Sequence, residues 1–330
     1  MLVAINRNNE TVYAHQAIIT EEYRCPYCKE KLLLKKGLKK IPHFAHVSQI
    51  KKRCMKNETE KHYYVKFFIA QRLKQYHFNV EIEPYFSKIM QYPDILVDAK
   101  VAIEVQFSRI SIKEVKSRSR GFEQIGVAVI WLIEQLQYRK GYLYLNTFQA
   151  YFINPIDRTL YSWEHEKQLI VKYVNIQHIG GRKFIAHRRI IQISELLSFN
   201  EKKNESYCYK LSNRHISRYI FNCRKKRSVL EPSLSAMYQL QITDDEVCRD
   251  TGYIFSYQIF IENHPVQWQL KLKLLLKHNL PKHYLMSYLK FRQFYLQDIN
   301  KEEITLKLID DYIQQVLSLI HISEPTRQAE

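Results

Sequence analysis

One stretch of the chain, residues 91–108, sets the strongest limits on the fold because it combines acidic groups with two apolar runs. The pattern predicts two strands joined by a short polar turn at Asp98-Ala99-Lys100. Side chains alternate between the two faces of a strand, so Glu104 and Gln106 are expected to share a face. The other face of that strand is expected to enter a core through Val101, Ile103, Val105 and Phe107.

The same stretch brings oxygen donors into apolar surroundings. Asp94 lies in the first run, and Glu104 and Gln106 lie in the second. Hard divalent cations prefer oxygen ligands, so this hairpin is a candidate Mg²⁺ or Mn²⁺ site. The order Pro-Asp, spacer, Glu-x-Gln resembles the Asp…Glu-x-Lys signature of the restriction-endonuclease-like nucleases, with Gln106 in the usual lysine position. Taken alone, the stretch also fits a half-buried hairpin with one solvated face.

Charge points to a polyanionic partner. The 330 residues include 51 basic and 33 acidic side chains, for a formal net charge of +18. Many basic residues are interleaved with tyrosine and phenylalanine, which can stack on bases, so we expect a nucleic acid as the partner rather than a membrane. The seven glycines form neither a Gly-x-x-x-x-Gly-Lys loop nor a Gly-x-Gly-x-x-Gly turn, which argues against a nucleotide-driven motor.

The sequence also indicates a compartment. It shows no signal-peptide pattern at its start and no apolar run near the ~20 residues of a membrane span, so we expect a cytoplasmic protein. Its six cysteines are mostly scattered, which favours one metal site and free thiols over a disulfide framework.

Four side chains near the start have the composition of a structural zinc site. Cys25 and Cys28 are separated by two residues, and His43 and His46 follow with the same spacing. Two thiolates and two imidazoles make the closed four-ligand set that zinc favours. We expect both histidines to face the metal from one helical turn. The alternative is two loop thiols and two surface histidines.

The following elements place the hairpin in a recognisable order. Residues 57–76 predict an amphipathic helix with Asn57 as N-cap and Glu60 completing the capping pattern. Glu58, His62 and Lys66 are spaced by four and share one helix face. A strand at 79–86, the hairpin, a basic helix at 111–122 and an apolar strand at 126–133 follow. Helix, three strands, helix and strand form the core layout of the endonuclease-like fold.

Residues 1 to about 135 resemble the competence protein CoiA family of Gram-positive bacteria. The motifs that carry this resemblance are Cys25-Pro-Tyr-Cys28, His43-Phe-Ala-His46, Glu58-Thr-x-x-His62-x-x-x-Lys66, Pro93-Asp94, Ile103-Glu-Val-Gln-x-Ser108 and Ile130-Trp-Leu-Ile133. The resemblance implies a zinc-binding N-terminal unit, a nuclease-like domain and a role in processing transforming DNA before recombination. It puts Glu58, Asp94, Glu104 and Gln106 on the family's presumed active-site positions. The family often has an arginine two residues before the aspartate, where this chain has Tyr92.

The leading hypothesis is a metal-dependent DNA nuclease. Asp94 and Glu104 would hold one Mg²⁺ or Mn²⁺ with the Val105 carbonyl, Gln106 would position a water, and Glu58 would complete a second metal site. Phosphates would be held by Lys66, Lys113, Lys116, Arg118 and Arg120.

Two alternatives remain open from the sequence. One is a DNA-binding adaptor that keeps the nuclease fold with little or no activity. The other, a zinc-dependent regulator that reads sequence, lacks a recognisable recognition helix. Single-stranded incoming DNA is the expected ligand, and recombination proteins are expected partners.

The expected fold class is α/β, with a restriction-endonuclease-like mixed sheet flanked by helices. We predict a zinc-binding unit at 1–54, the nuclease-like domain at 55–200, with a β-rich part at 140–195, and a basic helical region at 201–316. That region would be either a DNA- or partner-binding surface or a plain scaffold. Residues 317–330 resemble a translated sequencing adaptor, so we assign no function to His321 or Glu324.

Overall fold

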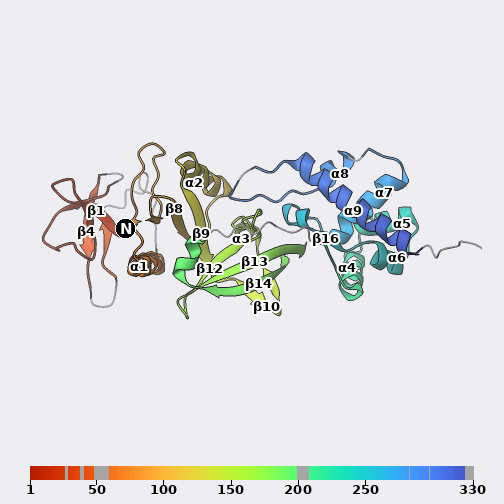
Figure 1. Cartoon of the computed structure of the whole chain (residues 1–330), viewed down its shortest axis with the longest axis horizontal. Coiled ribbons are helices and arrows are strands. Elements are labelled where there is room, and N and C mark those ends of the chain that lie inside the picture. Colours follow the sequence, from red (N-terminus) through yellow and green to blue (C-terminus); the bar gives the residue numbers. More distant parts are fainter. Residues whose placement is uncertain are drawn as a thin grey trace, which may run out of the picture. The chain divides into compact units, whose positions relative to one another are not determined.

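The structure is a computed structural model that describes residues 1–26, 29–37, 41–47, 59–198, 208–281, 283–296 and 298–323. The chain forms two compact units. Unit 1 comprises residues 1–135, 160–172 and 190–200; unit 2 comprises residues 136–159, 173–189 and 201–330. The architecture is mixed α/β, with several sheets flanked by helices, as predicted (Figure 1). The predicted domain boundaries at 54, 200 and 316 stay predictions.

Unit 1 begins with a small sheet of strand order β2-β1-β3-β4-β5. The sequence predicts strands at residues 2–5 and 11–13, and they are confirmed as an antiparallel pair. Buried small and aromatic residues from these strands, including Ala4, Tyr23 and Phe44, form the hydrophobic core of this part of the chain. The strand bounds are β1 (Val3–Ile5), β2 (Thr11–Tyr13), β3 (Tyr23–Arg24), β4 (Lys31–Lys35) and β5 (His43–His46).

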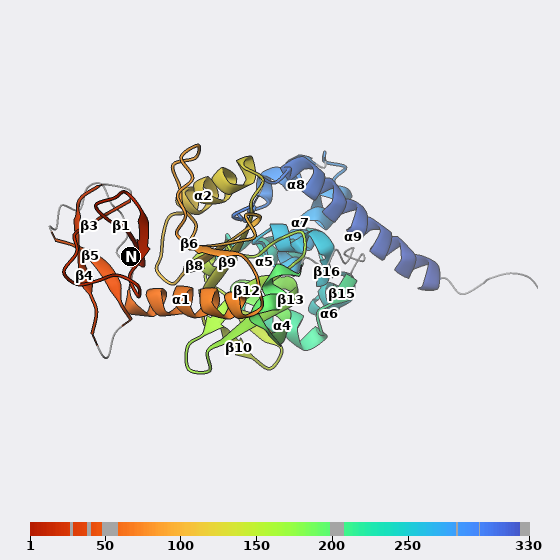
Figure 2. The same cartoon turned by 60° about the vertical axis from the view of Figure 1, so that its left-hand side comes forward.

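The larger sheet of unit 1 follows the predicted order of helix, three strands, helix and strand. Strands lie side by side in the order β12-β9-β8-β7-β6; β9 is parallel to β8 and β12, and β7 is antiparallel to its neighbours. Helices α1 and α2 cover opposite faces (Figures 1 and 2). The bounds are α1 (Glu60–Gln75), β6 (Val80–Ile82), β7 (Ile95–Val97), β8 (Val101–Gln106), α2 (Ile112–Gln124), β9 (Ala128–Glu134) and β12 (Leu160–Glu164).

The β7–β8 hairpin confirms the predicted turn and the predicted alternation of side chains. Asp98 and Ala99 have φ angles of 49° and 55°, the two left-handed residues of a tight hairpin turn whose twist matches the flanking strands. Ile103 and Val105 join the core under α1, whereas Ala102 packs on the α2 side. The register of β8 therefore fixes which face each polar residue of the strand occupies.

Helix α1 begins later than the capping pattern predicts. Its N-cap is Thr59, which is extended at φ −81° and ψ 161° and makes no side-chain cap bond, so the expected N-cap at Asn57 is wrong. Asn57 itself lies outside the described residues. The predicted apolar face is confirmed, because Val65, Ile69 and Leu73 are completely buried in the core of unit 1.

Unit 2 has strands in the order β10-β11-β14-β13, with antiparallel β10–β11 and β11–β14 pairs, a short β15–β16 pair and a mainly helical C-terminal part. Within the predicted β-rich part at 140–195, the sequence indicates a strand at Phe148–Ile153, and this prediction is wrong. Asn146 and Gln149 form a reciprocal cap that starts a helix there instead. The strand bounds are β10 (Gln137–Arg139), β11 (Tyr142–Tyr144), β13 (Leu169–Gly180, in unit 2 from residue 173), β14 (Lys183–Ile191, in unit 2 to residue 189), β15 (Cys208–Lys210) and β16 (Tyr253–Phe255). The α-helix bounds are α3 (Thr147–Ala150), α4 (Asn213–Lys225), α5 (Pro232–Leu240), α6 (Asp244–Asp250), α7 (Pro265–Lys277), α8 (His283–Tyr288) and α9 (Lys301–Ser323).

Two short 3₁₀ helices complete the secondary structure, η1 (Ile193–Leu197) in unit 1 and η2 (Ser256–Phe260) in unit 2. The sequence predicts a helix at 310–316, and this prediction is confirmed because the segment is part of α9. The interpretation of residues 317–330 as adaptor sequence stays a prediction. None of the described helices combines the length and apolar character that crossing a bilayer requires.

The two glycines at 180 and 181 predict a hairpin turn, which is confirmed and is also a packing site. Gly180 has φ 122°, and a Cβ built there would lie 2.1 Å from Cδ2 of His264. The His264 ring stacks on Tyr219 with centroids 3.8 Å apart, and its Nδ1 accepts a hydrogen bond from the Val266 N–H at the start of α7. Gly180 therefore lets the β13–β14 turn approach the start of α7.

We expect Gly180→Ala to lower the free energy of unfolding by about 2–5 kcal/mol, since backbone strain and the clash with His264 add. Gly181→Ala is the matched control, because Gly181 has φ 56° but nothing within 4 Å of the new Cβ. The Gly181→Ala substitution should lower the free energy of unfolding by only about 1–2 kcal/mol. Urea denaturation of both variants measures the difference, and equal losses would contradict the packing role of Gly180.

Candidate active site in unit 1

The candidate site is built around Lys66 of α1. This side chain is completely buried. Its Nζ lies 2.5 Å from Oε1 of Glu83 and 3.4 Å from Oδ1 of Asp94. An ammonium group removed from water needs such carboxylate partners, because its desolvation is otherwise very costly. Lys66 therefore joins helix α1 to two acidic residues that flank β6 and β7.

Glu83 is a member of the site that the sequence patterns did not reveal. In a regular continuation of β6 it would share the exposed face of Glu81, because residues two apart point the same way. Instead Glu83 adopts a left-handed φ of 54° and is buried, with an exposed fraction of 2%. The contact with Lys66 accounts for an inward carboxylate here, and the local sequence carried no signal for it.

Asp94 stands just before β7, where the pairing of β7 with β8 ends. The paired register stops at Ile95 opposite Ile103, and Oδ2 of Asp94 then accepts a hydrogen bond from the N–H of Val105 at 2.9 Å. The carboxylate thus replaces a missing ladder partner in the buried sheet. Nε2 of His62, one turn before Lys66 on α1, lies 3.4 Å from the same oxygen and hydrogen-bonds with the Val105 carbonyl.

Glu104 of β8 is paired from the opposite helix. Its Oε2 lies 2.5 Å from Nη2 of Arg118 on α2. The same Nη2 is 3.5 Å from the Tyr92 carbonyl oxygen, and the guanidinium lies 5.9 Å from the Trp131 ring centroid. Burial alone would lower the pKa of Arg118, but the carboxylates of Glu104 and Asp94 outweigh burial and raise it. Arg118 is therefore a fixed cation of the site.

Trp131 holds the Arg118 helix in place. Its indole N–H donates to the Ser119 hydroxyl at 3.0 Å, and that hydroxyl donates to the Val115 carbonyl at 2.9 Å. The buried β9 motif Ile130-Trp-Leu-Ile133 thus supports the orientation of α2 as well as filling the core.

The remaining predicted residues have different positions. Gln106 is half-buried at the end of β8, where its Nε2 donates to the Ser108 carbonyl at 2.7 Å. Glu58 lies outside the described residues. On α2, Lys113 and Arg120 are exposed and Lys116 is half-buried, so these three lie where a phosphate can reach them. Lys66 and Arg118, predicted to hold phosphates, instead face the carboxylates of the site.

The donor chemistry of the site fits a hard divalent cation, but its carboxylates are engaged by basic groups. Asp94, Glu104 and the Val105 carbonyl offer oxygen ligands of the kind Mg²⁺ takes. His62, Lys66 and Arg118 contact these same oxygens. Within the described ranges, no three histidine, cysteine or acidic side chains form a group that could hold a metal ion. A cation at this site would therefore compete with Lys66 and Arg118.

The sequence of the chain matches models of a known protein family. The sequence model described as "Competence protein CoiA, nuclease-like domain" matches residues 58–237, which is more than half of the chain. The chain belongs to the competence protein CoiA family. The family's N-terminal domain matches residues 7–55, so the resemblance inferred from the motifs is confirmed.

A curated member of the CoiA family is also similar in sequence. The competence protein CoiA of Bacillus subtilis (strain 168) is 31% identical over 148 residues, which are 42% of this chain and 39% of that protein. The match therefore spans about two fifths of the relative. No solved structure matches the chain. The restriction-endonuclease-like assignment of the fold thus stays a proposal.

The predicted zinc ligands of the CoiA N-terminal domain do not converge in the described part of the chain. Lys29 N–H donates to the Cys25 carbonyl and Cys25 N–H to the Glu30 carbonyl, at 2.9 and 2.8 Å, which makes a tight turn. His43 and His46, however, lie on strand β5, so the expected helical turn is wrong. Residues three apart on a regular strand point to opposite faces. Cys28 lies outside the described residues.

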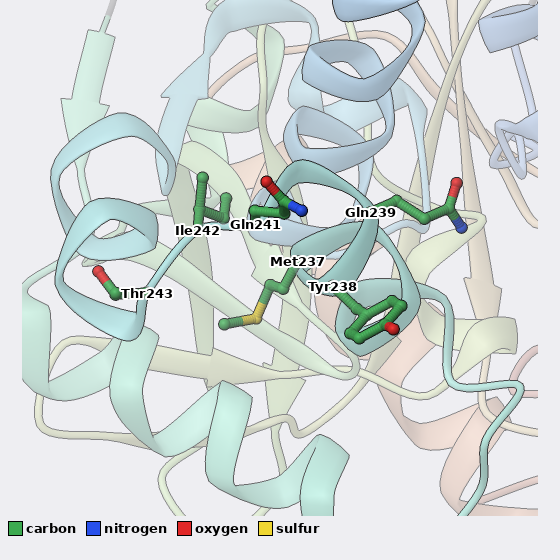
Figure 3. A pocket seen from close by; sticks show the side chains of 6 residues that line it. All are labelled: Met237, Tyr238, Gln239, Gln241, Ile242 and Thr243. Carbon is green, nitrogen blue, oxygen red and sulfur yellow. The ribbon is translucent and has the colours of Figure 1, made fainter.

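A hollow on the surface of unit 2 offers no comparable chemistry. It lies at the end of α5 and the start of α6 (Figure 3). Its lining residues, none of which carries a charge, are Met237, Tyr238, Gln239, Gln241, Ile242 and Thr243. The candidate catalytic residues among those described therefore come from unit 1.

We expect Lys66→Met to lower the free energy of unfolding by about 3–5 kcal/mol, because it leaves Glu83 and Asp94 buried without their shared cation. Adding Glu83→Gln should restore part of that loss. Lys61→Met, at an exposed position of the same helix, is the matched control. It should change the free energy of unfolding by less than about 0.5 kcal/mol. Chemical denaturation of the three variants tests this, and equal effects of the two lysine substitutions would contradict it.

Proposed function

We propose that unit 1 is a metal-dependent deoxyribonuclease that processes incoming DNA during natural competence. The observation that carries the proposal is the grouping of Asp94, Glu104 and Glu83 around Lys66 and Arg118. Three carboxylates against two fixed cations leave the group one formal negative charge, which favours a divalent cation over a further anion. The match to a nuclease-like domain supports the same chemistry.

Each residue has a role in this proposal. Asp94 and Glu104 are the metal ligands, and the Val105 carbonyl would join them if His62 gives way. A bound Mg²⁺ or Mn²⁺ would supply an activated water and offset the charge of the scissile phosphate. Gln106 can orient a water but carries no charge. In the nuclease signature a lysine stands where this chain has Gln106. The ammonium of Lys66 lies 3.4 Å from Oδ1 of Asp94, so we assign the electrostatic role of that lysine to Lys66.

The proposed substrate is single-stranded incoming DNA. Lys113, Lys116 and Arg120 on α2 are the phosphate contacts in this proposal, and their effect should weaken with salt. Glu58 keeps its proposed place in a second metal site. Recombination proteins that take over the processed strand are the proposed partners.

A DNA-binding adaptor with little or no activity is the second candidate. The observation that favours it is the engagement of every described carboxylate of the site by a basic side chain. The Val105 carbonyl is likewise taken by His62. In that case the ion pairs are a structural replacement for a metal, and the basic surfaces carry the function.

Asp94→Asn and Glu104→Gln are each expected to reduce DNA cleavage by about 100-fold or more, because each removes a charged ligand of the proposed ion. Glu81→Gln, an exposed carboxylate of β6, is the matched control and should cleave normally. The assay incubates the full chain with end-labelled single- and double-stranded DNA in Mg²⁺, Mn²⁺ or EDTA. Binding without cleavage by the wild-type protein in every metal would favour the adaptor instead.

We also propose that Cys25, Cys28, His43 and His46 hold one structural zinc ion. The tight turn after Cys25 supports the thiolate half of this site, whereas the strand at His43–His46 requires a local change before both imidazoles could reach one metal. We expect close to one zinc per purified chain by elemental analysis, and its loss in Cys25→Ser and Cys28→Ser. Cys208→Ser, at an exposed cysteine of unit 2, should retain it. A zinc-free wild-type protein would contradict the proposal.

A further inference from the structure

Helix α4 of unit 2 carries an exposed stripe that the nuclease proposal does not use. With 3.6 residues per turn, Arg214, Arg218, Phe221 and Lys225 lie within about 60° of one another around the helix axis. The buried residues of this helix, Ile216, Ile220 and Cys223, centre on the opposite side. The stripe is therefore the outward face of α4.

The basic side chains of this stripe are not committed to structural ion pairs. Elsewhere on or beside α4, Arg224 forms a two-pronged pair with Asp244 at 2.5 and 2.7 Å, and Lys226 lies 3.4 Å from Glu231. No carboxylate of the described ranges forms such a pair with Arg214, Arg218 or Lys225. The basic residues on or beside α4 thus fall into two groups. Arg224 and Lys226 form ion pairs, whereas the basic residues of the stripe are exposed to solvent.

Phe221 is the apolar member of the stripe. Its side chain is 53% exposed, although neighbouring apolar residues of α4 are buried. The ammonium of Lys225 lies 4.7 Å from the centre of its ring. A nucleobase can stack on the exposed face of such a ring, and flanking cations can then contact the adjoining phosphates.

We propose that this α4 stripe binds single-stranded nucleic acid. The helical rise places Arg214 and Lys225 about 16 Å apart along the axis, which is long enough for a few nucleotides of a strand. A duplex keeps its bases stacked on one another, so only an unpaired strand can offer a base to Phe221. This site lies wholly in unit 2 and does not depend on whether unit 1 cleaves DNA.

The test measures binding of the full chain to a fluorescent 20-residue oligothymidylate in EDTA, so that metal-dependent cleavage cannot contribute. We expect Phe221→Ala to weaken binding about five- to 100-fold, the effect of losing one stacked base. The double variant Arg214→Ala/Arg218→Ala should reduce the slope of log affinity against log salt by about 1.4, since two phosphate contacts are lost.

Two matched controls keep the test specific. Tyr284→Ala removes an exposed aromatic ring of α8, and Arg139→Ala removes an exposed arginine of β10; both should bind as the wild type does. All four variants change only exposed positions, so each should unfold at the same temperature as the wild-type protein. Ultraviolet cross-linking should also attach thymidine to the tryptic peptide of residues 219–224.

The proposal is overturned if Phe221→Ala and the double arginine variant keep wild-type affinity and salt dependence. It is also overturned if the wild-type chain does not bind the oligonucleotide in EDTA. Equal binding of a 20-base-pair duplex, with the same loss in Phe221→Ala, would reject the single-strand preference. Loss of cleavage with normal binding would affect only the function proposed for unit 1.

Discussion

The buried ion pairs of Lys66 are the interaction on which the organisation of unit 1 depends. A fully buried ammonium is tolerated only beside carboxylates, and here Glu83 and Asp94 share it. This requirement fixes the rotation of α1 over the sheet. It also accounts for the left-handed backbone at Glu83, because the local strain is small beside the cost of an unpaired buried charge.

Arg118 performs the corresponding task from the other face of the sheet. Glu104 is buried on β8, and the guanidinium from α2 neutralises it while lying near the Trp131 ring. Two helices on opposite faces thus each send one cation to the end of the β7–β8 hairpin. These two cations stabilise the fold. They also contact the carboxylate oxygens that a metal ion would use, so the same contacts bear on both structure and catalysis.

The N-terminal segment is tied into the same unit through α1. The amino group of Met1 donates to the Phe44 carbonyl at 3.1 Å and also contacts the Tyr63 hydroxyl. The ring of His43 stacks on Tyr63, with centroids 5.4 Å apart. Residues Leu2 and Val3 enter the main core. The small sheet and the nuclease-like part of unit 1 therefore share packing around α1.

The hairpin at 91–108, its tight turn, the facing of Ile103 and Val105 into the core, and the order of elements around them could be predicted from the sequence. These features follow from alternation and helical periodicity, which act between residues close in the chain. The sequence also drew attention to Asp94 and Glu104 as acidic residues of that hairpin. It did not indicate that Lys66 and Arg118 face these carboxylates or that Glu83 turns inward, and these features emerge from the folded structure. They depend on which charges are buried together, and partners 14 to 28 residues apart leave no periodic pattern by which they could be recognised.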